Sequence, residues 1–179
     1  MTRQFAPHLR TGLPSSTMRA LSITVLLALT SVASADGERA ADKGSFGVGI
    51  MIGEPVGLTA KLYLRDDRAI QAGIGSAFIG GGFQGDADYL FHPYILQDRD
   101  SFTMPLYFGP GVRVVQYDNG RDSSYVALGA RIVGGMLFDF KNVPLDTFVE
   151  LAIIPEYGFG ANHGFALRLN ADAGIRYYF

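Results

Sequence analysis

The last fifteen or so residues of the chain, from Phe165 to Phe179, alternate strictly between two kinds of side chain. Odd-numbered positions are all apolar, and even-numbered positions are mostly polar, charged or small. Side chains on a β-strand point alternately to its two faces, so this stretch predicts a strand with one apolar and one polar face. The apolar positions are Phe165, Leu167, Leu169, Ala171, Ala173, Ile175, Tyr177 and Phe179.

The same two-residue period recurs along the chain from Ser45 onward, where short apolar-rich runs alternate with turn residues and no helical stripe is seen. This organisation predicts an all-β fold of about eight antiparallel strands in an up-and-down meander. The predicted strands are Ser45–Ile52, Val56–Leu64, Ala69–Phe78, Phe83–Phe91, Thr103–Gln116, Tyr125–Phe138, Leu145–Phe159 and Phe165–Phe179. The longest predicted connection is His92–Phe102.

Three prolines lie inside these predicted strands, at Pro105, Pro110 and Pro155. Proline cannot donate a hydrogen bond to a neighbouring strand. Each of the three therefore predicts either a bulge or a strand end beyond the bilayer.

An export signal precedes the strands. Arg10 and Arg19 supply positive charge, and an apolar stretch from Ala20 to Ala33 follows and ends in Ala33-Ser34-Ala35, the small-x-small pattern that signal peptidase accepts. The stretch is shorter than the roughly 20 apolar residues that a membrane-spanning helix needs. Met18 is an alternative start of translation, and a chain that begins there would still contain the whole apolar stretch. The predicted organisation is a signal peptide over 1–35, a short periplasmic tether over 36–44 and an outer-membrane barrel over 45–179.

Two closed arrangements fit alternating strands: a soluble barrel with its apolar face inside, and a transmembrane barrel with its apolar face outside. The apolar faces hold on the order of forty side chains, more than an eight-stranded interior can take. The opposite faces combine charged residues with many glycines, which suit a crowded lumen. Aromatic residues gather near the strand ends of the apolar faces, as interfacial girdles do. The pattern favours a closed transmembrane β-barrel.

The parity of each strand then identifies the side chains that point into the lumen. They comprise five basic and five acidic groups: Lys61, Arg113, Arg131, Arg168 and Arg176, with Asp86, Asp88, Glu150, Glu156 and Asp172. Asp146 has the same parity, but its place at a strand start predicts a solvated rim. Balanced charge in a confined space indicates a salt-bridge network that plugs the pore. The alternative is a path for protons or ions through it.

The final residues, Gly174 to Phe179, resemble the C-terminal signature of bacterial outer-membrane proteins. The resemblance implies that Ile175, Tyr177 and Phe179 are read by the barrel-assembly machinery, that periplasmic chaperones escort the chain, and that both termini are periplasmic. The chain as a whole resembles small eight-stranded barrels of the OmpX and OmpA-transmembrane-domain type. The first hairpin, from Phe46 to Leu58, is similar to that of a family of uncharacterised outer-membrane proteins.

Composition excludes several functions. The chain has no Cys, so disulfides, thiol catalysis and Cys-based zinc sites are excluded. Its net charge of -2 offers no basic surface for nucleic acid. The oxygen-rich run from Asp118 to Asp122 lacks the bidentate Glu of a calcium loop, and His92 has no ligand-like neighbour in sequence. No cofactor and no metal site are expected.

Some eight-stranded barrels modify lipid A, and a site of that kind would lie near the loops predicted to be external. The candidates are His163 with Ser123 or Ser124, and Asp118 or Asp122 as the acid. No His-x-Ser spacing of the deacylase kind is present, and Ser and Asp are common turn residues. We therefore expect no enzymatic activity but a structural or surface-interaction role with outer-membrane lipid around it, with a narrow channel as the second hypothesis and a lipid-modifying enzyme as the third.

Overall fold

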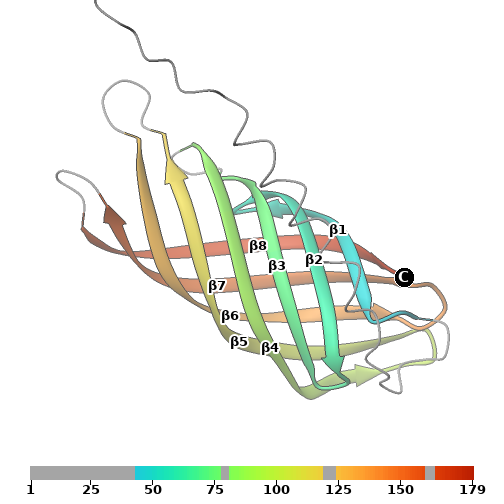
Figure 1. Cartoon of the computed structure of the whole chain (residues 1–179). Coiled ribbons are helices and arrows are strands. Elements are labelled where there is room, and N and C mark those ends of the chain that lie inside the picture. The colour runs from blue at the N-terminus through green and yellow to red at the C-terminus, as the bar shows by residue number, and fades with distance from the viewer. Residues whose placement is uncertain (1–42, 78–80, 119–123, 160–163) are drawn as a thin grey trace, which may run out of the picture. The chain divides into compact units, whose positions relative to one another are not determined.

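A computed structural model describes residues 43–77, 81–118, 124–159 and 164–179. Eight strands, joined in chain order, form one closed antiparallel barrel (Figure 1). The strands are β1 (Phe46–Gly53), β2 (Val56–Arg65), β3 (Arg68–Ser76), β4 (Phe83–Asp98), β5 (Phe102–Tyr117), β6 (Tyr125–Phe140), β7 (Leu145–Phe159) and β8 (Phe165–Tyr178). In this described part, no helix is long and apolar enough to cross a membrane. The all-β meander predicted from the sequence is confirmed.

The signal peptide, with its cleavage residues Ala33 and Ala35, lies outside the described residues, as does most of the predicted tether. Of the tether, Lys43 and Gly44 are described. The signal peptide and its cleavage site stay predictions.

One predicted boundary is wrong by more than two residues. β4 continues to Asp98, where the sequence pattern predicted an end at Phe91 and a connection over His92–Phe102. The pairing of β4 with β5 shifts register between Phe91 and Tyr94, and again between Ile95 and Gln97. These irregularities break the two-residue period, which is why the pattern did not reveal the end of the strand.

The three strand prolines behave differently. Pro105 pairs with Ile95 beside a register shift, but the extra residue of this irregularity is on β4, opposite the proline. The β5–β6 register runs unchanged through Pro110, and the β7–β8 register runs unchanged through Pro155, so neither is a bulge or a strand end. A strand N–H faces only one neighbouring strand, and one missing donor leaves the rest of the ladder in place.

The two faces of each strand differ in exposure as the parity predicts. On β7, Leu151 is 66% exposed, whereas the next residue, Ala152, is 2% exposed. Exposed aromatic residues gather towards strand ends, with Phe159 and Phe165 at one end of the barrel and Tyr177 and Phe179 at the other. The outer surface is therefore apolar and bounded by aromatic girdles, which is the arrangement of a transmembrane barrel.

Lumen glycines make room for side chains that reach across from neighbouring strands. A Cβ on Gly111 would lie 1.9 Å from Oδ1 of Asp88, and a Cβ on Gly47 would lie 2.8 Å from the ring of Tyr178. The lumen also holds buried apolar side chains, including Met51. The interior is thus a packed core and not an open pore.

Candidate functional site in the lumen

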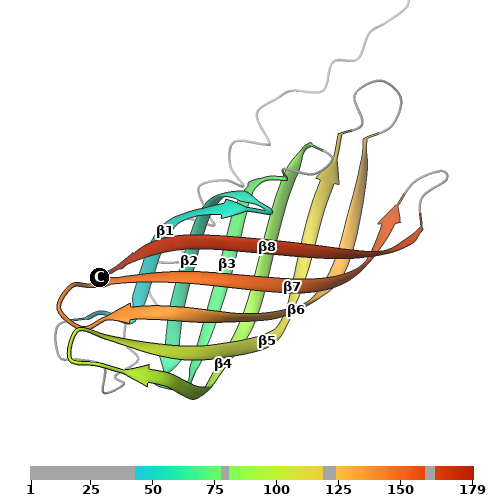
Figure 2. The same ribbon diagram turned by 180° about the vertical axis from the view of Figure 1, so that it is seen from behind.

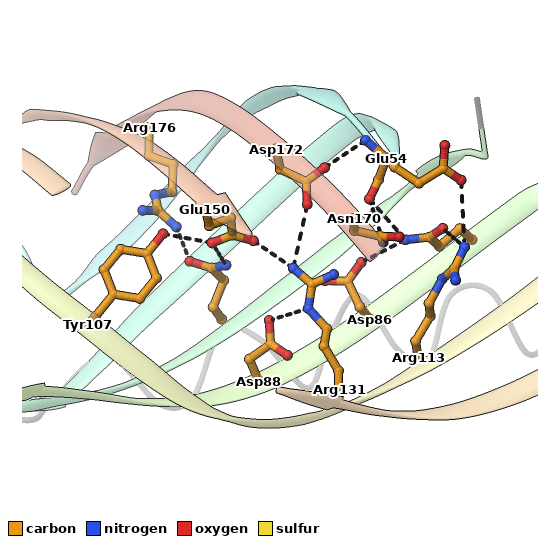
Figure 3. Close-up of polar contacts among 12 residues, drawn as sticks. Glu54, Asp86, Asp88, Tyr107, Arg113, Arg131, Glu150, Asn170, Asp172 and Arg176 are labelled. Atoms are coloured by element: carbon orange, nitrogen blue, oxygen red, sulfur yellow. Dashed lines mark hydrogen bonds and ion pairs between the residues drawn. The ribbon is translucent and has the colours of Figure 1, made fainter. Parts of the chain in front are cut away.

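Arg131 of β6 lies at the centre of the lumen among three carboxylates (Figure 3). Its Nη2 atom donates to Oε1 of Glu150 at 2.7 Å, and its Nε atom donates to Oδ2 of Asp88 at 3.2 Å. Oδ2 of Asp172 is 3.5 Å from Nη2. All four side chains are buried, so the arginine compensates charges that water does not reach.

A second cluster lies towards the end of the barrel where β1 begins and β8 ends. Nε of Arg176 donates to Asp146 at 2.9 Å, and Nη1 of the same arginine donates to Oε1 of Gln71 at 2.5 Å. The hydroxyl of Tyr178 donates to the other oxygen of Asp146 at 2.5 Å. The guanidinium also packs on the ring of Phe148, 4.1 Å from its centroid.

The prediction that Asp146 lies at a solvated rim is wrong, because the residue is 0% exposed. It pairs directly with Arg176 across β7 and β8. Lys43, just before β1, bonds to Asp139 and to the carbonyl oxygen of Leu145 and covers this end of the lumen. A position at the start of a strand is therefore enclosed here by the segment that precedes β1.

The third cluster lies at the opposite end, where β5 and β7 carry Arg113 and Glu156. Nη1 of Arg113 is 3.0 Å from Oε2 of Glu156, and Nη2 donates to Gln84 at 2.6 Å. Tyr117 and Arg168 both donate to Oε1 of Glu156, at 2.9 and 3.1 Å. The side chain of Arg168 is 43% exposed, so this predicted lumen residue lies at the mouth and not within the buried plug.

Glu54, in the turn between β1 and β2, points into the barrel and links the central and outer clusters. Its backbone N–H donates to Asp172 at 2.8 Å, and its carbonyl oxygen accepts from Asn170 at 2.7 Å. Its carboxylate is 3.6 Å from Nη2 of Arg113. The sequence pattern predicted only that this residue lies between two strands. The two flanking predicted strands are short, and this shortness indicates a turn that does not reach the rim of the barrel.

Lys61 and His92 meet inside the barrel. Nζ of Lys61 lies 3.0 Å from Nε2 of His92 and lies over the rings of Tyr63 and Tyr107, 4.7 and 5.0 Å from their centroids. The sequence placed His92 in a turn, and this is wrong because β4 continues past it. The lysine is fully buried, as the parity rule predicts.

These contacts form one continuous network along the lumen. From Asp146 it passes through Arg176 and Gln71 to Glu150 and Arg131, and from Asp172 it continues through Glu54 to Arg113 and Glu156. Adding Asp146 and Glu54 to the ten predicted groups gives five basic and seven acidic residues in the described lumen. The uncharged members were missed, although the same parity rule identifies them: Gln71, Gln84, Tyr107, Tyr117, Asn170 and Tyr178.

Two cavities lie at the ends of this network. One of about 310 Å³ is lined by Lys43, Tyr63 and His92 on the side where β1 begins. The other, of about 290 Å³, is lined by Arg113 and Arg168 at the opposite end. The buried clusters fill the space between them.

The proposed catalytic residues are largely untested by the structure. His163, Ser123 and Asp122 lie outside the described residues, while Ser124 and Asp118 are exposed in the connection between β5 and β6. Within the described ranges, no group of three or more His, Asp or Glu side chains is placed to hold a metal ion.

Comparison with known proteins defines a class of fold. The structure is similar to the N-terminal β-barrel domain of Pseudomonas aeruginosa OprF, with a TM-score of 0.51 and 14% sequence identity over 75% of this chain and 95% of that domain. The chain therefore has the eight-stranded barrel fold of an OprF-type domain. No family model matches the sequence, and no curated protein matches it. The narrower resemblance of the first hairpin to an uncharacterised family stays a prediction.

Proposed function

We propose that the chain is an integral protein of a bacterial outer membrane whose lumen is closed by a charged side-chain network, and that it has a structural or surface-interaction role without catalysis. The observation that carries the proposal is the continuous buried network inside an apolar wall. An eight-stranded barrel has just enough interior space for its own side chains. The side chains around Arg131 occupy that space and are joined by its hydrogen bonds to Asp88 and Glu150.

The proposal takes the end of the barrel where β1 begins and β8 ends as the periplasmic end. With eight strands, the start of β1 and the end of β8 lie at the same end of the barrel. On this assignment, the ends of β5 and β7 and the starts of β6 and β8 face outward. The expected partners are the lipids of the outer membrane, together with periplasmic chaperones and the barrel-assembly machinery during biogenesis.

The architecture is tested by refolding the chain from Asp36 in detergent and comparing boiled with unboiled samples by gel electrophoresis. A closed barrel resists the detergent until it is heated, so the unboiled band should migrate differently. Planar-bilayer recording then tests closure, and we expect no steady conductance. Identical bands, together with solubility once detergent is removed, would show that the apolar face is buried and would overturn the proposal.

A narrow cation channel is the second candidate, and two observations favour it. Acidic groups outnumber basic ones, seven to five, in the described lumen, and a cavity lies at each end of the network. A channel requires that the side chains around Arg131 and Arg113 move to admit an ion. Steady, cation-selective conductance of the wild-type protein would replace the closed-lumen proposal with this one.

The absence of catalysis has its own test. Overexpression of the protein should leave the mass spectrum of lipid A unchanged. A new lipid A species that disappears in the His163→Ala variant would assign an enzyme activity instead.

A further inference from the structure

The wall of the barrel is low, that is, short along the barrel axis, where β1 and β2 meet. β1 has 8 residues and β8 has 14. With a rise of about 3.3 Å per residue and a tilt of about 40°, β1 covers roughly 20 Å, whereas the apolar band of such barrels is about 25 Å tall. The start of β1 is level with the end of β8, since Phe179 donates its N–H to the carbonyl oxygen of Phe46. The shortfall is therefore at the opposite end, by the turn that contains Glu54.

Because the wall is low here, the edge of β8 that faces β1 is unpaired over part of its length, although its other edge pairs with β7. β1 pairs with β8 from Asp172 to Tyr178, but β8 begins at Phe165, and among the described residues no strand pairs with this edge over 165–170. Figure 2 shows β8 continuing well beyond the tip of the β1 arrow. We call the gap between residues 165–170 of β8 and the β1–β2 turn the β8 notch. An unpaired strand edge is strongly disfavoured in hydrocarbon, so polar atoms are required there.

The 290 Å³ cavity lies in this notch and joins the two faces of the wall. Its lining includes Leu167 and Leu169, which belong to the apolar outer face and are 65% and 73% exposed. It also includes Arg113 and Asn170, which are buried in the lumen. An amphipathic molecule therefore finds an apolar surface and a polar recess side by side.

The most exposed charge in the lining of the notch is that of Arg168, while the carboxylate of Glu54, also in the lining, is 3.6 Å from Nη2 of the buried Arg113. The side chain of Arg168 is 43% exposed, whereas Glu156 beneath it is 3% exposed. Arg168 engages Glu156 through Nε, and within the described residues its Nη atoms make no hydrogen bond. Behind it, Nε of the buried Arg113 also has no hydrogen-bond partner among the residues that the structure describes. Guanidinium donors in this arrangement suit the oxygens of a phosphate.

We infer that the β8 notch binds a phosphate-bearing lipid of the surrounding membrane, with the phosphate against Arg168 and the acyl chains along Leu167 and Leu169. The inference rests on the proposed function, because it requires the barrel to be embedded in a bilayer. The headgroup supplies the polar atoms that the unpaired edge of β8 needs, and the low wall at Glu54 gives it lateral access.

The chain contains no Trp, so a single introduced Trp reports on one place alone. Leu169→Trp places the reporter in the notch, and Leu128→Trp places it on the lipid-facing side of β6 as a control. The full chain is reconstituted in phosphatidylcholine vesicles that contain brominated phosphatidylglycerol or brominated phosphatidylcholine. We expect the notch reporter to favour the anionic quencher about threefold to fivefold, the preference that one partly exposed ion pair provides, and the control reporter to show no preference.

Adding Arg168→Gln to the notch reporter should abolish the preference, while adding Arg65→Gln, which changes an exposed arginine in the β2–β3 turn, should leave it intact. Equal quenching by the two lipids at both positions, or a preference that survives Arg168→Gln, would overturn this inference. Neither result would affect the proposed function. If neither reporter is quenched, the barrel is not in the bilayer and the proposed function itself fails.

Discussion

Gly135 on β6 lies directly beneath the ring of Tyr107 on β5, its cross-strand partner. A Cβ at Gly135 would be 2.5 Å from both Cζ and the hydroxyl oxygen of that ring. The glycine thus lets Tyr107 lie flat across the wall and donate to Glu150 at 2.7 Å. Because Gly135 has no side chain, Tyr107 can donate a hydrogen bond to the buried carboxylate of Glu150.

We therefore predict that Gly135→Val destabilises the barrel by about 1–3 kcal/mol, the usual cost of overpacking a core. The measurement is the temperature at which the unboiled gel band converts to the boiled one. Gly164→Val is the matched control, because no atom of the described residues lies within 4 Å of a Cβ placed there. Equal effects of the two substitutions would contradict the packing of Tyr107 on Gly135.

Arg131→Met should destabilise the barrel by about 3–5 kcal/mol, since it leaves buried carboxylates without their compensating charge. Equilibrium unfolding in denaturant, in the presence of lipid vesicles, measures the change. Arg65→Met removes an exposed arginine from the β2–β3 turn and should have little effect. A tolerated Arg131→Met would mean that the central cluster is hydrated and that the lumen is not plugged there.

Leu151→Arg tests which face of the barrel meets lipid. Leu151 is 66% exposed near the middle of β7, and an arginine at the bilayer midplane should cost about 2–4 kcal/mol. Val143→Arg, in the turn between β6 and β7, should be nearly neutral. Unfolding free energies in vesicles compare the two variants, and equal values would argue for a surface in water.

Arg113→Ser should raise the conductance of the barrel and make it cation-selective. The substitution removes the side chain that links Glu156, Gln84 and Glu54, and it leaves four basic groups against seven acidic ones in the described lumen. Planar-bilayer recording in a salt gradient gives both conductance and selectivity. Arg99→Ser, in the exposed β4–β5 turn, should behave as the wild type. A silent Arg113→Ser barrel would place the closure deeper, at the central cluster.

Phe179→Ala should slow assembly by the barrel-assembly machinery more than it slows spontaneous folding into detergent. Phe179 is 69% exposed and packs against Tyr177, with ring centroids 5.0 Å apart. Phe165→Ala changes a similarly exposed aromatic residue at the other end of β8 and is the control. Time courses of the folded gel band, with and without the machinery, give the rates. Parallel slowing of both variants would remove the assembly-signal assignment.

The sequence by itself determined the local properties of each strand. The two-residue period identified all eight strands and separated the lipid-facing residues, such as Leu151, from the lumen residues, such as Arg131. The same period placed many of the glycines on the lumen side of the strands, together with the charged residues. These properties depend only on the alternation of side chains along a single strand, so the order of residues is sufficient to predict them.

Only the tertiary structure decided which lumen groups meet. Parity places Asp146 and Glu150 on the same face of β7, but it does not say that one pairs with Arg176 and the other with Arg131. It also did not place Glu54 inside the barrel. The height of a residue in the lumen depends on the stagger that accumulates around the closed ring of strands, and that stagger is set by pairing between strands and not by any one of them.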